Sequence, residues 1–360
     1  MAKTRVGVIG SGWRSTLYLQ AAKDLPDEFE IVSMRVRSEE KKARFEQEWG
    51  IPVTTSMDEF KSAKPDFVVD AVNRGDPEKG VPGVYEVAVD LINDGIPVLA
   101  ETPPAESVQQ CVDLWNLVQQ KNVKMLVAEN YFAEPDFAAK LEAAARGYLG
   151  DVQTVTVSNT HEYHAISVMR LLLDAQYTPL TVIGKRMDMD LTLTQDKDGS
   201  AITDGRTQKV ERFHLLLNFD NGKTGIYDFA IAQYWSAIRS RYFMVQGSKG
   251  EIKDDEIWYL DQNNSPRQSR FISNKTADGK LINITVDDKV LYENTLLAKG
   301  VGSNLGVTHM MLNMKRYLET GEAPYSFASA MQDTYITRLF IEAGRNPFKP
   351  IRSEQMPWMP

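Results

Sequence analysis

Residues 1–16 have the sequence MAKTRVGVIGSGWRST, and this stretch decides the fold of the chain. The apolar run 6–9 predicts a buried strand, Gly10 and Gly12 predict a tight turn, and residues 17–22 predict a helix. In a strand–turn–helix unit of this kind, backbone N–H groups and the helix N-terminus face a pyrophosphate. We therefore expect a dinucleotide-binding site at this turn.

The turn departs from the G-x-G-x-x-G pattern at its third position, where Ser15 replaces glycine. Serine is small enough for close helix–strand packing, and its hydroxyl can cap the helix or reach a phosphate. We include Trp13, Arg14 and Ser15, with Gly10 and Gly12, among the expected cofactor-binding residues. Glycine turns also follow strands for purely structural reasons, so the motif needs support from the rest of the chain.

Length and composition bound the class of protein. The chain has 360 residues, 42% hydrophobic and 25% charged, which is ordinary globular composition and enough for two domains. A net charge of −8 argues against a nucleic-acid partner. The single cysteine, Cys111, excludes an intrachain disulfide and fits a reducing compartment. With neither a signal segment nor a membrane span in the sequence, we expect a cytoplasmic protein without a membrane partner.

Strands and helices alternate through the first third of the chain. Strands are expected at 30–36, 66–72, 97–100 and 123–128, and helices at 39–49, 57–63, 84–94 and 107–120. Such repeated βα units predict a doubly wound parallel sheet of the Rossmann type. Ligands bind beyond the carboxyl ends of its strands, so several strand-end residues should line one crevice. These are Gly10, Val36, Asn73, Glu101 and Glu129.

The pattern changes after residue 128. Helices are expected at 137–146, 161–173, 305–319 and 329–344, and strands at 151–160, 213–219, 223–229, 241–246 and 256–260. The polar stretches 195–206 and 261–279 are expected to be surface loops, with active-site lids as the alternative. The fold class is thus α/β plus α+β, with a C-terminal domain on a mostly antiparallel, open-faced sheet. We expect a dinucleotide-binding domain at 1–128, a substrate-binding domain at 129–360, and an active site between them.

Several ordered motifs carry a family resemblance. They are GVIGSG at 7–12, VLAETP at 98–103, AEPDF at 133–137, GYLG at 147–150 and MQDTY at 331–335, together with a helix that opens near His164. The chain resembles the glucose–fructose oxidoreductase / inositol dehydrogenase / MocA family. This resemblance implies an NAD(P)-dependent oxidoreductase acting on a sugar, polyol or related hydroxy compound. It also implies a homo-oligomer, a dimer or tetramer, that uses the C-terminal sheet as an interface.

The family usually has Glu-Lys-Pro after the strand at 97–100, and this chain has Glu101-Thr102-Pro103. The resemblance assigns the lysine to the nicotinamide ribose and to proton transfer. Threonine donates a hydrogen bond but carries no charge and does not titrate near neutrality. We therefore expect Glu101 in the cofactor site and Thr102 as a hydrogen-bond donor. The loss of lysine weakens the simplest dehydrogenase mechanism, whereas cofactor binding can survive it.

A second family position is a histidine at a helix start, followed three residues later by aspartate. His164 matches the histidine, while Ser167 replaces the aspartate. Histidine suits acid–base work near neutral pH, so we expect His164 to be the catalytic acid or base, with Tyr163 and His161 as alternatives. A helix-start histidine can equally be a capping or interface residue. The remaining histidines, His214 and His309, are expected to be structural.

The end of the second strand indicates which nucleotide binds. NAD enzymes usually have Asp or Glu there to hold the ribose 2′-OH, whereas this chain has Val36-Arg37-Ser38. Arg37 and Ser38 can hold a 2′-phosphate, which favours NADP over NAD. The alternative is that Arg37 is a solvated loop charge. Asn73 is expected at the cofactor rim, and Arg74 contacts a phosphate, a substrate acid or only solvent.

Other chemistries lack their motifs. The sequence has neither zinc-ligand spacing nor a G-x-S-x-G elbow nor a P-loop, so we expect no metal. In the aromatic stretch 227–235 and just beyond it, Tyr234, Trp235 and Arg239 can clamp a sugar or simply pack in the sheet. Two other functions stay open. One is a glycoside hydrolase or lyase that retains its cofactor, and the other is a non-catalytic NADP-sensing protein.

Overall fold

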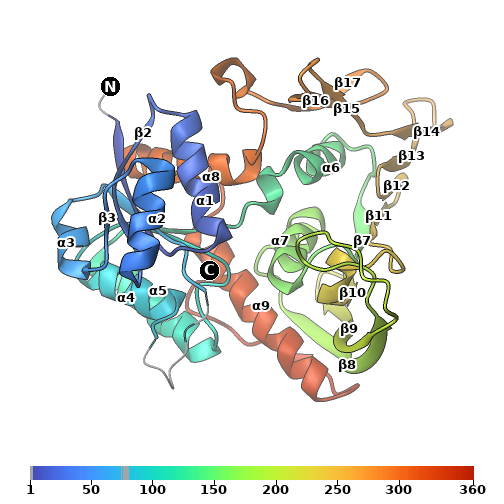
Figure 1. The fold of residues 1–360 in the computed structure, drawn as a ribbon. Helices are drawn as coiled ribbons and strands as arrows, with labels where there is room; N and C mark the ends of the chain where they lie inside the picture. The colour runs from blue at the N-terminus through green and yellow to red at the C-terminus, as the bar shows by residue number, and fades with distance from the viewer. Residues whose placement is uncertain (1–2, 74, 76–80) are drawn as a thin grey trace. The chain divides into compact units, whose positions relative to one another are not determined.

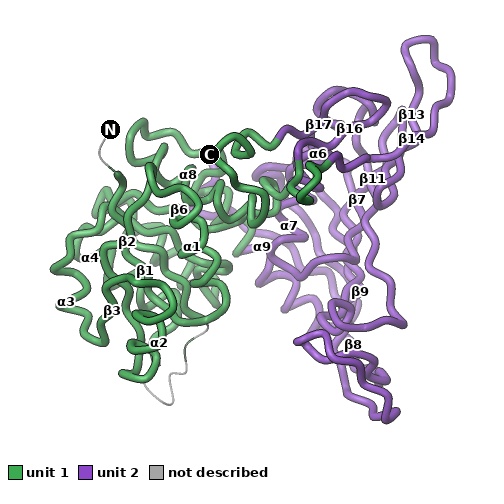
Figure 2. The backbone as a smooth tube through the Cα atoms, turned by 45° about the horizontal axis from the view of Figure 1, so that its top comes forward, with its two compact units in different colours: residues 1–134, 275–281, 294–334 green, residues 135–274, 282–293, 335–360 purple. Residues whose placement is uncertain are grey.

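The computed structural model describes residues 3–73, 75 and 81–360, and its chain divides into two compact units (Figure 2). Unit 1 contains Met1–Glu134, Lys275–Leu281 and Asn294–Thr334. Unit 2 contains Pro135–Asn274, Ile282–Glu293 and Tyr335–Pro360. The sequence predicts one division, after residue 128. In the structure the chain passes between the two units several times in its last quarter, so each unit contains segments from that quarter.

Unit 1 is built on a parallel sheet (Figure 1). Within the described residues its order is β3-β2-β1-β4-β5-β6, which is that of a doubly wound dinucleotide-binding sheet. The strands are β1 (Thr4–Ile9), β2 (Phe29–Arg35), β3 (Val53–Thr54), β4 (Phe67–Asp70), β5 (Val98–Ala100) and β6 (Met125–Val127). All four residues of β4 are buried, as expected for a strand covered on both faces. The predicted Rossmann sheet is confirmed.

Within the described residues, several α-helices lie wholly in unit 1. They are α1 (Trp13–Asp24), α2 (Glu39–Trp49), α3 (Met57–Ser62), α4 (Val84–Asn93), α5 (Val108–Lys121) and, from late in the chain, α8 (Leu305–Thr320). Polar contacts hold α8 in this unit. Glu28 accepts from Lys299 at 2.5 Å and from Lys315 at 2.6 Å, and Lys124 Nζ donates to the Tyr317 carbonyl at 2.8 Å. These tertiary contacts leave no local pattern, which is why a single division after residue 128 does not describe the units.

Unit 2 is built on a larger mixed sheet. Among the described residues its order is β14-β13-β12-β11-β7-β10-β9-β8-β18, and only the β7–β10 pair is parallel. The strands are β7 (Val152–Val157), β8 (Leu180–Thr192), β9 (Thr207–Phe219), β10 (Thr224–Phe229), β11 (Phe243–Gly247), β12 (Gly250–Lys253), β13 (Glu256–Leu260), β14 (Pro266–Arg270) and β18 (Ile351–Arg352). Leu215 and Leu217 are buried, while Leu216 between them is 38% exposed. One face is therefore open, and the predicted fold class is confirmed.

The remaining elements complete the chain. The small sheet has β15 (Ile272–Lys275), β16 (Leu281–Val286) and β17 (Lys289–Glu293), and the helices are α6 (Pro135–Ala145), α7 (Glu162–Leu172), α9 (Phe327–Arg345), η2 (Tyr131–Ala133), η3 (Ile231–Trp235) and η4 (Leu297–Lys299). The stretch 261–279 is not only loop, because β14 and β15 lie in it. Their polar, exposed residues hide the strand pattern. None of the described helices has the length and apolar character to cross a membrane.

Candidate functional site

A cavity of about 370 Å³ lies at the carboxyl ends of β1, β2 and β4 in unit 1. Four of the expected cofactor residues line it, namely Gly10, Gly12, Arg37 and Asn73. Ser11, Arg35 and Lys41 line it as well, and the sequence analysis did not select them. Of the five strand-end residues expected in one crevice, Gly10, Val36 and Asn73 line this cavity, whereas Glu101 and Glu129 are not among its described lining residues. The cavity lies at the ligand-binding edge of a doubly wound sheet.

The two glycines of the turn serve different purposes. Gly10 has φ +124°, and a Cβ on it would lie 2.4 Å from the Ala71 carbonyl oxygen. Gly12 is the N-cap of α1 with φ −84°, and a Cβ on it would meet nothing within 4 Å. The fold therefore requires Gly10, whereas Gly12 keeps the backbone open beside the cavity. Together with the helix N-terminus, this open backbone fits a diphosphate.

Ser15 lies beneath the turn. Its side chain is fully buried, and its Oγ lies 3.0 Å from the position of a Cβ on Gly10. A larger residue would therefore press against the turn from below. This placement agrees with the close helix–strand packing expected of the third motif position.

Cations gather at one side of this cavity. Lys41 Nζ donates to Ser11 Oγ at 3.0 Å, and the Arg37 guanidinium donates to the Pro82 carbonyl at 3.3 Å. The buried Arg35 Nε has no hydrogen-bond partner among the described residues. No Asp or Glu is among the described residues that line the cavity. These three cationic side chains give the cavity a positive field suited to a phosphate.

The sequence did not indicate Lys41 as a cofactor residue, because it lies inside α2 rather than in a loop at a strand end. Ser38, expected to bind cofactor, is the N-cap of α2, and its Oγ accepts from the Lys41 N–H at 3.3 Å. The cap fixes the first turn of α2, from which Lys41 extends to the glycine turn. A basic residue in the first turn after the second strand is the signal that could have found it.

A buried ion pair connects the start of α1 to the end of β5. Arg14 Nε and Nη2 lie 2.9 and 2.8 Å from Glu101 Oε1, and the Tyr18 hydroxyl donates to the same oxygen. Burial lowers the pKa of Arg14, but the Glu101 carboxylate outweighs burial and raises it. Burial, reinforced by Glu101, raises the pKa of Tyr18. Arg14 and Glu101, both expected to bind the cofactor, thus form an ion pair with each other. Trp13, also expected to bind the cofactor, is 71% exposed.

Two further groups mark the strand ends of unit 1. Thr102 directly follows Glu101, and the Thr102–Pro103 peptide is cis. Asp70, the last residue of β4, is fully buried; burial raises its pKa well above the ordinary value, and nearby Glu101 adds to the rise. Its carboxylate accepts a hydrogen bond from the Val72 N–H at 3.4 Å.

In unit 2 two histidines and a tyrosine meet at the start of α7. His161 is the N-cap of this helix, and its ring lies 4.6 Å from that of His164, edge to face. The Tyr234 hydroxyl lies 3.0 Å from His161 Nδ1, accepts from the His161 N–H at 3.2 Å, and donates to Thr160 Oγ1 at 3.1 Å. We call His161, His164 and Tyr234 the histidine cluster. It places two imidazoles and a phenol where protons can be exchanged.

The neighbours of His164 differ from expectation in detail. Ser167 Oγ donates to the His164 backbone carbonyl at 3.0 Å, so it does not orient the imidazole as an aspartate would. Tyr163 is only 2% exposed, and Tyr234 supplies the hydroxyl beside His161. The sequence indicated Tyr234 as a residue that clamps a sugar or packs in the sheet, and its pairing with α7 was missed because that contact is tertiary.

The other selected residues lie elsewhere. Arg239 donates to the Ile238 carbonyl at 2.9 Å, and His214 pairs with Asp228 at 3.1 Å. Burial lowers the pKa of His309. Arg74 lies outside the described residues. Within the described residues no group of three or more His, Cys, Asp or Glu side chains is arranged to hold a metal.

Comparison with known proteins places these features in a family. Residues 4–129 match the model of the oxidoreductase family with an NAD-binding Rossmann fold, the GFO/IDH/MocA family. The match lies in the first third or so of the chain and confirms, for that part, the resemblance found in the sequence. An uncharacterized oxidoreductase of Schizosaccharomyces pombe is 30% identical over 157 residues, which span 42% of this chain and 40% of the yeast protein. The match thus covers less than half of that relative.

Solved structures share the fold over nearly the whole chain. An NAD-binding oxidoreductase from Klebsiella pneumoniae is 17% identical, with a TM-score of 0.68 over 98% of this chain and 100% of that one. An oxidoreductase from Agrobacterium radiobacter, solved with NAD+, L-tartaric acid and magnesium, is 14% identical. Its TM-score is 0.67 over 97% of this chain and 98% of that one. GenD2 from gentamicin A biosynthesis, solved with NAD, is 16% identical. Its TM-score is 0.65 over 99% of this chain and 97% of that one. At these identities the likeness establishes the fold.

Proposed function

We propose that this protein is an NAD(P)-dependent oxidoreductase that acts on a sugar, polyol or related hydroxy compound. The observation that carries the proposal is the cavity at the glycine turn, whose open backbone and cations match a dinucleotide. When bound, NADP supplies a nicotinamide ring that accepts or donates the hydride. The family match of residues 4–129 and the NAD-bound neighbours support the same class.

We further propose a preference for NADP over NAD. A 2′-phosphate needs cationic or hydroxyl partners, while a free ribose 2′-OH needs an acidic acceptor. Arg35, Arg37 and Lys41 line the cavity, and no described lining residue is acidic. Lys41 is the strongest candidate, because its ammonium donates to the Ser11 hydroxyl, which does not neutralise the charge.

The proton work is assigned to the histidine cluster. Oxidation of an alcohol requires a group that takes the hydroxyl proton, and Thr102 cannot do so because its hydroxyl does not titrate near neutrality. We assign that proton to His164, with Tyr234 and His161 positioned to pass it on through their 3.0 Å contact. Thr102 donates a hydrogen bond, and the Arg14–Glu101 pair holds the end of β5 in place.

The remaining proposals concern the whole protein. We assign cofactor binding to residues 1–128, and substrate binding and oligomerisation to residues 129–360. A homo-oligomer, a dimer or tetramer, fits the open face that Leu216 marks on the unit 2 sheet. We place the protein in the cytoplasm, where dinucleotide cofactors and small hydroxy compounds are available to it.

Calorimetric titration with NADPH and NADH tests the cofactor proposal. We expect NADPH to bind about tenfold or more tightly than NADH, and Lys41→Met to remove about tenfold of that preference, since it loses one charge-assisted contact. Lys42→Met, one position along α2, is the matched control and should change neither affinity. Equal binding of both nucleotides by the wild type would contradict the preference, and the absence of any binding would contradict the function.

Turnover with a panel of sugars and polyols tests the proton assignment. We expect His164→Asn to leave NADPH affinity unchanged and to lower kcat by roughly 10²–10⁴. His214→Asn, on β9 and paired with Asp228, is the control and should retain activity. The assay follows the absorbance of reduced nicotinamide. A His164→Asn enzyme with the wild-type kcat would show that another group carries the proton.

A further inference from the structure

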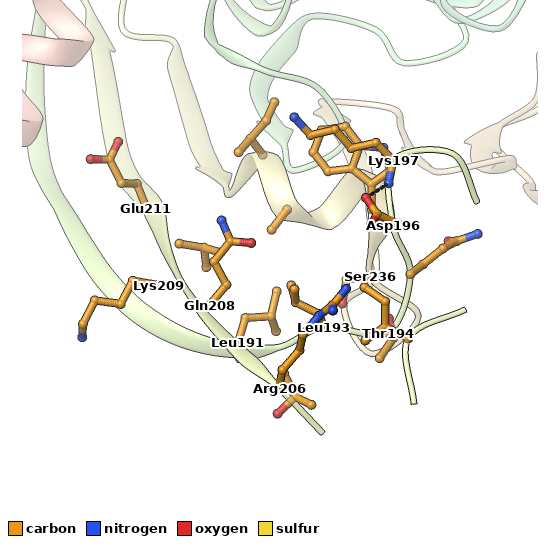
Figure 3. Close-up of a pocket in the computed structure, with 17 residues that line it drawn as sticks. Leu191, Leu193, Thr194, Asp196, Lys197, Arg206, Gln208, Lys209, Glu211 and Ser236 are labelled. Carbon is orange, nitrogen blue, oxygen red and sulfur yellow. Dashed lines mark hydrogen bonds between the residues drawn. The ribbon is translucent and has the colours of Figure 1, made fainter. Parts of the chain in front are cut away.

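A second cavity, of about 540 Å³, lies wholly within unit 2 at the far end of the β8–β9 hairpin (Figure 3). Its walls are the hairpin end, the polar stretch 193–206 and η3. This volume falls in the range of small-molecule sites. We propose that it binds an anionic sugar, at a site separate from the histidine cluster.

The cavity is a built feature of the fold. Leu191 and Val210 are 3% and 7% exposed, although they lie on the hairpin beyond the exposed Asp188 and Asp190. The polar stretch is fastened to the chain just after η3, because the Ala237 N–H donates to Thr194 Oγ1 at 2.8 Å. The cavity thus has an apolar floor, formed by Leu191 and Val210, and one wall held by the Thr194 hydrogen bond. The sequence analysis expected a surface loop at 195–206, within this wall.

Three side chains that line the cavity have groups that can contact a sugar, through its C–H face or its hydroxyl groups. Trp235 offers an aromatic surface of the kind that packs against the C–H face of a sugar ring. The Ser236 hydroxyl is buried and has no hydrogen-bond partner within the part of the chain that the structure describes. In Figure 3 the Gln208 amide points into the cavity. The Ser236 hydroxyl and the Gln208 amide can hydrogen-bond to the hydroxyl groups of a ligand that packs on the Trp235 ring, which suits a polyhydroxylated ligand.

Cations outnumber carboxylates in the lining of the cavity. The Glu211 carboxylate pairs with Arg186 at 2.9 Å, and Lys209 has only a weak, exposed contact with Asp190 at 3.4 Å. The Asp196 carboxylate accepts from the neutral Lys197 backbone N–H at 2.7 Å and keeps its charge. The lining thus holds three cations, Lys197, Arg206 and Lys209, against two carboxylates, Asp196 and Glu211.

Lys197 and Arg206 provide the positive charge. The Lys197 ammonium lies over the Trp235 ring, 5.3 Å from its centre. Arg206 has only a 3.5 Å contact with Asp204, and both side chains are more than half exposed, so this pair is weak. A ligand that packs on Trp235 therefore meets an ammonium and a guanidinium, which favours a carboxylate or phosphate on the sugar.

The geometry separates this cavity from the histidine cluster. Tyr234 and Trp235 are neighbours in η3, but Tyr234 contacts His161 whereas Trp235 lines the cavity. None of His161, His164 and Tyr234 is among the residues that line it. The Tyr234 and Trp235 rings lie 5.8 Å apart, edge to face, so the group that distinguishes the two sites is the Tyr234 hydroxyl, which contacts His161.

Calorimetry on the full chain without nucleotide tests the proposal. The probes are D-glucuronate and D-glucose 6-phosphate, with D-glucose as the neutral comparison. We expect at least one anionic probe to bind about tenfold more tightly than glucose, and Lys197→Met to remove that difference. Tighter binding of glucuronate identifies a carboxylate ligand, and tighter binding of glucose 6-phosphate identifies a phosphate ester.

Matched variants locate the bound probe. Lys253→Met, an exposed lysine on β12, should leave the affinity unchanged. Tyr234→Phe should also leave it unchanged, because it removes only the hydroxyl at the histidine cluster. Trp235→Ala should abolish binding; Trp235→Phe, which keeps an aromatic face, should bind, and thermal unfolding confirms that both are folded.

Three results would overturn the proposal. They are no heat of binding with either anionic probe, unchanged affinity in Lys197→Met, and loss of affinity in Tyr234→Phe equal to that in Trp235→Ala. The last result would place the probe at the histidine cluster. Because no nucleotide is present, failure here leaves the cofactor proposal standing, and failure of the NADPH titration leaves this site standing.

Discussion

Gly10 and Gly12 differ in what a side chain would meet, and this difference separates folding from nucleotide binding. Gly10→Ala should cost about 2 kcal/mol of stability, because φ is +124° and the new Cβ would press on the Ala71 carbonyl. Gly12→Ala should retain the melting temperature, since its Cβ meets nothing, but should weaken NADPH binding about tenfold by placing a methyl beside the diphosphate. Thermal unfolding and calorimetry measure the two effects.

Each glycine variant is the control for the other. If Gly12→Ala lowered the melting temperature as much as Gly10→Ala, both glycines would serve only the turn. If Gly12→Ala left NADPH affinity unchanged, the open backbone would not face the nucleotide. Either result would remove the main structural support for a diphosphate at this turn.

At the residue scale, the sequence located groups at strand ends and missed groups that reach them from elsewhere. Gly10, Gly12, Arg37 and Asn73 follow strands, so the parallel pattern alone placed them at one edge. Lys41 reaches the same cavity from a helix turn. In unit 2 the Tyr234–His161 contact joins residues 73 apart in sequence. Periodicity describes only neighbours, so it cannot predict such contacts.

At the scale of elements, Glu28 joins the approach to β2 with η4 and α8. Its hydrogen bonds from Lys299 and Lys315 lower its pKa from 4.5 to about 2. Because the folded pKa lies below the unfolded one, this stabilisation is complete above pH 4.5 and is lost as the pH falls toward 2. Glu28→Gln should therefore lower stability by about 1 kcal/mol at pH 7, after allowance for solvent screening.

Urea unfolding of wild type and Glu28→Gln at pH 7 and at pH values from about 5 down to 3 measures this dependence. The difference between the two proteins should shrink as the pH falls. Glu30→Gln, two residues along on β2, is the control and should show no such trend. A difference that stayed constant with pH would mean that the lost contact is not ionic.

Strength of local pattern explains which elements the sequence predicted. The β4 segment is wholly buried and apolar, and the β9–β10 hairpin has its Asn221-Gly222 turn with Gly222 at φ +81°. By contrast, β8 was missed, because charged residues alternate through its outer half and most of that half is exposed. Edge strands such as β15, with all four residues exposed, carry no apolar alternation. Their pairing partners, and not their own side chains, make them strands.

At the scale of the whole molecule, fold class was predictable and the composition of the units was not. Repeated βα units require a parallel sheet, so the order of elements determined the Rossmann sheet of unit 1. The return of residues 294–334 to that unit depends on which helix covers the exposed side of α1. Several late amphipathic helices could cover it equally well by pattern, and only the packed structure distinguishes α8.

The same return predicts how fragments behave. Residues 1–134 alone should unfold well below the full chain and with a broad transition, because α1 loses the cover of α8, and Glu28 and Lys124 lose their partners. Joining residues 294–334 to this fragment through a flexible linker should restore a cooperative transition and NADPH binding. The same fusion with Lys315→Met should recover less stability, since one of the two Glu28 contacts is missing. A fragment 1–134 that melted as sharply as the fusion would show that the Rossmann sheet is stable without α8, and that a single division near residue 128 describes the folding unit after all.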